Sequence, residues 1–118
     1  MSEEWPLSTR VRTHLSRRRR SAVKRKYKTL FDETSALLFR RDPVGINFEV
    51  NTDEYDPEVG TILPRLSGCH SALEVRKVVY EEFLRWFGPE TAGDEISYSS
   101  IAEELWQLWS THQNAVRL

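Results

Sequence analysis

The sequence has one cysteine, five glycines and five prolines in 118 residues, and it has no long run of apolar residues. A lone cysteine, Cys69, cannot form an internal disulfide, which favours a reducing compartment such as the cytoplasm. The low proline and glycine content excludes collagen-like and low-complexity chains. No segment approaches the ~20 apolar residues that cross a bilayer. The first residues show no apolar stretch behind a basic flank, so we expect neither a membrane span nor a secretory signal.

Large apolar side chains are plentiful enough for one folded domain. Hydrophobic residues make up 39% of the chain and include 4 Trp, 5 Phe and 4 Tyr, too many for a fully disordered protein. A length of 118 residues supports one core and is too short for two domains and a linker.

The net charge of -1 conceals two segments of opposite charge. Residues 1–41 carry 12 Lys/Arg and 4 Asp/Glu, a balance of +8, whereas residues 42–118 carry 5 and 14, a balance of -9. Ten basic residues lie between Arg10 and Lys28, with no acidic residue among them. Such asymmetry predicts a basic arm on an acidic body.

The predicted fold is all-α, a single domain of four helices, one of them short, over residues 22–118. Apolar residues recur at three- and four-residue steps, which is typical of amphipathic helices. The four segments with this pattern are residues 22–41, 56–68, 71–88 and 97–115. Residues 1–21 have little apolar material, so we expect a basic, partly disordered N-terminal arm. Ile46, Phe48 and Val50 alternate with polar residues, but no partner strand is apparent, so a packed loop is expected there.

Capping and helix-breaking residues set the expected helix boundaries. Helix starts are predicted where an aspartate precedes a proline, or a serine precedes a glutamate by three residues. These patterns are Asp56-Pro57, Ser71-Ala72-Leu73-Glu74 and Ser100-Ile101-Ala102-Glu103. Helix ends are predicted where proline or glycine interrupts the spacing. These interruptions are Asp42-Pro43, Ser67-Gly68 and Gly88-Pro89, and Pro64 adds a predicted kink inside the short helix.

A succession of short motifs runs through residues 41–110. The motifs are Asp42-Pro43-Val44-Gly45-Ile46, Asp53-Glu54-Tyr55-Asp56-Pro57-Glu58-Val59, Ile62-Leu63, Phe83-Leu84-Arg85-Trp86-Phe87-Gly88 and Ile101-Ala102-Glu103-Glu104-Leu105-Trp106. In these motifs the chain resembles a family of small bacterial helical proteins of unknown function. The resemblance implies a compact helical fold and a bacterial cytosolic setting, and it supplies no activity or site residue. Small acidic helical proteins also occur among toxin-neutralising immunity proteins, which indicates an inhibitor-like role by analogy only.

The sequence contains no recognisable catalytic or cofactor motif. It has no P-loop, no glycine-rich phosphate loop and no serine elbow. Cys69 and the three histidines do not have the spacing of a zinc site. The acidic residues after Asn51 lack the glycine and the third ligand of a calcium loop. We therefore expect no enzyme activity, no cofactor and no metal ion.

Two sets of charged residues are candidate binding surfaces. The main hypothesis is a non-catalytic interaction protein that meets a basic protein partner through an acidic face. That face is Asp53, Glu54, Asp56 and Glu58. The alternative is a nucleic-acid-associated protein whose basic residues neutralise phosphates. Those residues are Arg17, Arg18, Arg19, Arg20, Lys24, Arg25, Lys26 and Lys28. A third possibility is that the basic residues fold against the acidic body of the same chain.

Overall fold

The computed structural model describes residues 18–45 and 54–117, and all regular secondary structure in these ranges is helical. Residues 18–27 form a helical segment that precedes the labelled helices. The elements that follow are α2 (Thr29–Arg41), α3 (Asp56–Ile62), the 3-10 turn η1 (Leu63–Gly68), α4 (Ala72–Ala92), the 3-10 turn η2 (Glu95–Tyr98) and α5 (Ser99–Arg117). The predicted all-α class is therefore confirmed over the described residues. The loop expected at Ile46, Phe48 and Val50, and residues 1–17 of the arm, lie outside them.

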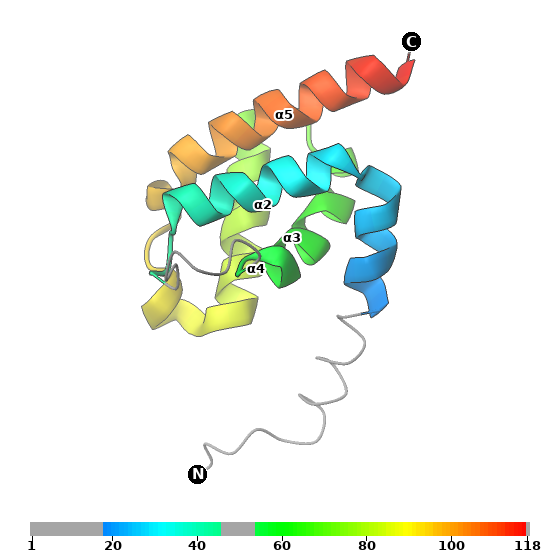
Figure 1. Ribbon diagram of the computed structural model, residues 1–118. Coiled ribbons are helices and arrows are strands. Elements are labelled where there is room, and N and C mark those ends of the chain that lie inside the picture. Colours follow the sequence, from blue (N-terminus) through cyan, green and yellow to red (C-terminus); the bar gives the residue numbers. More distant parts are fainter. Residues whose placement is uncertain (1–17, 46–53, 118) are drawn as a thin grey trace.

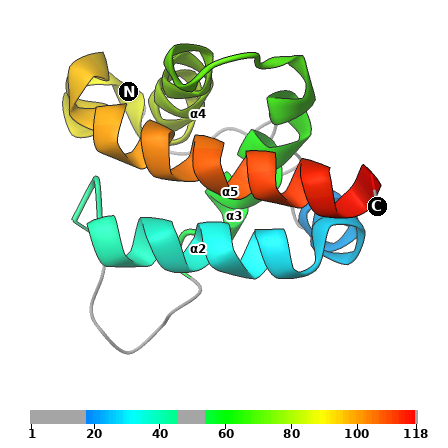
Figure 2. The same cartoon turned by 90° about the horizontal axis from the view of Figure 1, so that it is seen from above.

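Helices α2 and α5 run side by side in opposite directions, and α4 runs across them on the far side of α2 (Figure 1, Figure 2). Helix α3 lies beside α2 and packs on α4 as well. The helical residues 18–27 turn away from the start of α2 and descend along the edge of the body (Figure 1). None of the described helices is long and apolar enough to span a membrane.

Each helix contributes apolar side chains to one core. The ring of Phe83 on α4 is completely buried, and its centroid lies 5.3 Å from that of Tyr98 and 6.0 Å from that of Tyr55. Large aromatic side chains bury ~150–250 Å² each, so this cluster joins α4, η2 and the start of α3.

The structure breaks the helix expected over residues 22–41 at Lys28. Lys28 has φ 49° and ψ -113°, outside the helical region. The bend allows Val23 and Tyr27 to reach the core, where both are more than nine-tenths buried. Burial of two large side chains outweighs strain at a single residue. Residues 18–21, which the sequence assigned to the disordered arm, are helical as well, so the helical part of the chain begins earlier than predicted.

Replacing Lys28 by glycine is expected to stabilise the fold by about 1 kcal/mol relative to Lys28→Ala. Both substitutions remove the charge, but only glycine occupies the observed φ and ψ without a Cβ clash. Urea unfolding of the two variants measures the difference in the free energy of unfolding. Equal stability of the two variants would contradict a strained bend at this residue.

Proline and glycine change the helices where the sequence predicted interruptions. At Pro64 the α-helical backbone of α3 has already given way to η1. Gly88 takes φ 84°, a conformation that favours glycine, and the helix resumes for one more turn to Ala92. The predicted end at Gly88-Pro89 is thus a kink with a continuation.

One of the two predicted capping boxes is half confirmed and the other is wrong. Ser71 caps α4, but the carboxylate of Glu74 accepts from the backbone N–H of His70 at 2.6 Å and not from that of Ser71. At the start of α4 the backbone N–H of Glu74 donates to Ser71 Oγ at 3.2 Å. Ser100 lies inside α5, because Ser99 already has helical φ and ψ and follows η2 directly. A preceding 3-10 turn can supply the carbonyls and geometry that a capping side chain otherwise provides.

Candidate functional site

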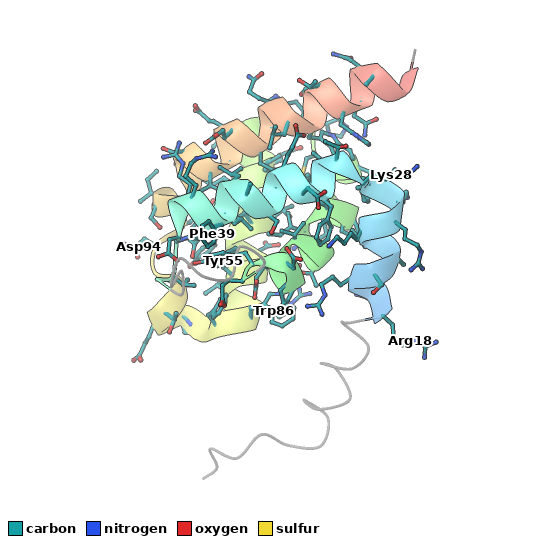
Figure 3. The ribbon with its side chains drawn as sticks, in the orientation of Figure 1. Arg18, Lys28, Phe39, Tyr55, Trp86 and Asp94 are labelled. Atoms are coloured by element: carbon teal, nitrogen blue, oxygen red, sulfur yellow. The ribbon has the colours of Figure 1, made fainter. Side chains whose placement is uncertain are left out.

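Seven of the eight predicted nucleic-acid-binding residues are described, and they lie on the helical residues 18–27 and at Lys28 directly after them. Arg17 lies outside the described residues, and we call residues 18–28 the basic segment. Its inner side is formed by Val23 and Tyr27, both buried, and by the half-buried Arg20. Helical spacing turns Arg18, Arg19, Arg25 and Lys26 away from this inner side, whereas Lys24 lies on its flank. The outer residues Arg18, Arg19, Arg25 and Lys26 are all exposed, and we call them the basic face. Figure 3 shows Arg18 and Lys28 at opposite ends of the segment, on the edge of the molecule.

The inner flank of the basic segment contacts α3 very closely. A Cβ atom placed on Gly60 would lie 3.2 Å from Cα of Arg20, so only glycine permits this approach without displacement. Lys24 Nζ lies 4.0 Å from Asp56 Oδ2 and 5.6 Å from the centroid of the Phe31 ring. The basic segment is therefore held on the body by packing as well as by charge.

Two residues of the predicted acidic face are covered by these contacts. The side chain of Asp56 is 16% exposed and accepts a hydrogen bond from Ser35 Oγ. It makes no capping hydrogen bond, since the N-cap of α3 is Tyr55. Glu58 is only 4% exposed. The structure thus brings Asp56 and Glu58 together beneath Lys24 and Arg20.

The carboxyl group of Glu58 is buried without full compensation. Its Oε1 atom has no hydrogen-bond partner among the described residues. Burial raises the pKa of Glu58 to about 7, although a hydrogen bond from its own backbone and the charge of Arg20 oppose the shift. Glu54 is half-buried and interacts with other groups, and Asp53 lies outside the described residues.

A hollow between η1 and the second half of α5 was not found from the sequence. Its volume is about 330 Å³. The residues that line it are Ser67, Cys69, Trp106, Trp109, Ser110, Gln113 and Asn114. Burial raises the pKa of the Cys69 thiol, so that group stays protonated and the described lining carries no charge. The spacing of Trp106, Ser110 and Gln113 places them on one face of a helix, but nothing in the sequence indicated that η1 lies opposite.

An ion-pair cluster fixes η1 on α4. Arg65 Nη1 donates to Glu82 Oε2 at 2.8 Å and Arg65 Nη2 donates to Glu81 Oε1 at 2.7 Å. The guanidinium lowers the pKa of Glu81. Glu82 is 1% exposed and has a second cation, Arg85 Nη1, 3.4 Å from its Oε2 atom. Because Ser67 and Cys69 follow Arg65 on the chain, this cluster also positions one wall of the hollow.

Histidine and cysteine side chains do not gather into a ligand set in the described part of the chain. No three His, Cys, Asp or Glu residues there are grouped to hold a metal ion. His112 instead packs against aromatic rings, 5.8 Å from Tyr27 and 6.0 Å from Trp109 between centroids.

Comparison with known proteins gives no relative. No family model matches the chain, and neither the curated proteins nor the solved structures contain a match. The resemblance to small bacterial helical proteins stays a prediction.

Proposed function

We propose that this protein is a non-catalytic binding protein that contacts the phosphates of nucleic acid through its basic face. The observation that carries the proposal is the exposure of Arg18, Arg19, Arg25 and Lys26 along one side of a helix whose other side is buried. Each phosphate neutralised by such a cation releases counterions, which provides strong and salt-dependent affinity.

Docking of the basic segment also reduces the entropic cost of binding. Tyr27 and Val23 anchor the helix in the core, so the backbone that carries these cations is ordered before any ligand arrives. Preorganised groups lose less conformational freedom on binding than those of a disordered arm. The arginine side chains add forked donors that match phosphate oxygens.

A charge-neutralising double variant tests this function. We expect Arg18→Gln/Arg25→Gln to reduce the slope of log affinity against log salt concentration by about 2, because two phosphate contacts are lost. The measurement is fluorescence anisotropy of labelled duplex DNA and of single-stranded RNA, from about 50 to about 200 mM salt.

The matched control is Arg40→Gln/Lys77→Gln, which removes two exposed cations outside the basic segment. Arg40 pairs with Glu104 at the surface, where loss of a pair changes stability little. Equal effects of the two double variants, or absence of binding at low salt, would refute the proposed function.

Binding of a basic protein partner through the acidic face has less support. Asp56 and Glu58 already face Lys24 and Arg20 of the same chain, so a partner would have to displace the basic segment. Asp53→Asn/Glu54→Gln separates the two hypotheses. It should leave nucleic-acid affinity undiminished, whereas an immunity-like or inhibitor-like protein would lose its partner.

We also propose that this protein is a single helical domain of the bacterial cytoplasm, preceded by a basic arm. The support is the single cysteine and the resemblance of residues 41–110 to small bacterial helical proteins. Its non-catalytic character is supported by the lack of catalytic motifs in the sequence.

A further inference from the structure

We propose that the hollow between η1 and α5 takes an unpaired base of a single-stranded nucleic acid, while the basic segment holds neighbouring phosphates. This inference rests on the proposed function and extends it from the strand's backbone to its bases. It assigns a role to Trp106 and Gln113 that charge alone does not supply.

The lining has the chemistry that a nucleobase requires. Single-stranded bases are commonly bound by stacking on aromatic side chains and by hydrogen bonds to their edges. Trp106 provides an indole ring, and Gln113 and Asn114 provide amides that both donate and accept. Trp109 also lines the hollow, but it is 6% exposed and belongs to the core. Trp106 is only partly buried, so its ring has surface left for a ligand.

The absence of charge along the described lining favours the base over the phosphate. A phosphate there would meet no cation among the described lining residues, whereas a neutral base can stack on them and form hydrogen bonds with them. The volume of about 330 Å³ lies at the small end of the range for ligand pockets. A base paired within a duplex cannot enter such a hollow unless it leaves the stack.

A continuous series of contacts connects the hollow to the basic segment. Trp109 lines the hollow, and the centroid of its ring lies 6.1 Å from that of Tyr27. On Tyr27, in turn, lies Lys26, whose Nζ atom is 5.4 Å from the ring centroid. A cation of the basic face is thus separated from the hollow by two aromatic rings, both of them buried. The two sites are therefore close in space, and a strand that contacts both would run over the surface above these rings.

A comparison of strands with and without bases tests the inference. The probes are a mixed-sequence single-stranded DNA and an abasic strand of the same length, both labelled for anisotropy. We expect the full-length protein to bind the strand with bases about tenfold more tightly, the effect of stacking one or two bases. Trp106→Leu should remove this difference and leave affinity for the abasic strand unchanged.

Gln113→Ala serves as a second variant, because it removes an amide from the hollow without taking a large ring out of α5. Like Trp106→Leu, it should reduce the preference of the protein for the strand with bases over the abasic strand. Arg18→Gln/Arg25→Gln should lower the affinity for both strands by the same factor. Circular dichroism of each variant confirms that the helices remain folded.

The outcomes separate this inference from the proposed function. Equal affinity for both strands would overturn the base site and leave phosphate binding intact, whereas no binding to either strand would overturn both. If both Trp106→Leu and Gln113→Ala still bind the strand with bases more tightly than the abasic strand, the base binds at another site. Free nucleoside monophosphates that bind as tightly as the strand would also overturn it, since the site would then serve a free nucleotide.

Discussion

Raising the pH from about 4.5 to about 8 is expected to lower the free energy of unfolding by about 3 kcal/mol through Glu58 alone. The folded protein holds a proton on this buried carboxyl group up to a pKa of about 7, whereas the usual value is 4.5. Between these values the folded state binds more protons than the unfolded chain, so stability falls as the pH rises. The contribution is fully present below the unfolded pKa and is lost once the pH passes the folded one.

Glu58→Gln isolates this effect from the other titrating groups. Glutamine is neutral at every pH and occupies nearly the same volume in the contact between α3 and the basic segment. The difference in unfolding free energy between the natural protein and the variant should therefore change between about pH 4.5 and about pH 8. Above that range it should be constant. Urea unfolding at a series of pH values gives the two curves. Parallel curves would show that Glu58 does not titrate as its burial implies.

Replacing Arg65 by methionine is expected to destabilise the fold by about 3 kcal/mol. Glu82 is 1% exposed, and Arg65 donates to it directly at 2.8 Å. Removal of one partner leaves a buried charge with less compensation, which costs far more than the net stabilisation from the intact pair. Arg85 retains its contact with Glu82, and this keeps the expected loss at the lower end of the range for such variants.

The double variant Arg65→Met/Glu82→Met should recover most of that stability, because two apolar side chains then replace a buried pair. Glu81→Gln is the matched control. It removes the more exposed carboxylate from the same guanidinium and should cost at most about 1 kcal/mol. Thermal or urea unfolding of these three variants and the natural protein gives the change in unfolding free energy for each. A double variant that is no more stable than Arg65→Met would contradict a buried-charge origin.

Local signals in the sequence predicted the elements that local chemistry decides. The serine at position 71 and the glutamate three residues later predicted the start of α4, and the cap is present. Pro64 and Gly88 predicted departures from α-helical geometry, and both occur. Each of these signals acts within a few residues of itself, so no knowledge of the tertiary structure was needed.

The bend at Lys28 could not be predicted in this way. The residues around it contain neither glycine nor proline, and Val23, Tyr27 and Leu30 keep helical spacing through it. The decision between a straight and a bent helix depends on contacts with α3, which is distant in sequence. Asp56 illustrates the same limit, because its side chain meets Ser35 and Lys24 instead of capping its own helix.

The candidate surfaces were predicted in part. The concentration of positive charge was evident, and the contact of Lys24 with Asp56 agrees with the possibility that the basic residues fold against the acidic body. Burial of Glu58 was not evident, because a glutamate in the first turn of a helix is ordinarily exposed. The hollow joins Ser67 and Cys69 to residues of α5 that lie some 40 positions later, and only the tertiary fold brings them together.

The close approach of Arg20 to Gly60 determines how the protein responds to ionic strength. Dispersion contacts at this distance are insensitive to salt, whereas exposed charges more than a Debye length apart are screened. Added salt should therefore release a bound polyanion while leaving the helix that binds it seated on α3. A salt titration of this protein should then report mainly the number of phosphates contacted, with a smaller contribution from the Lys24–Asp56 ion pair.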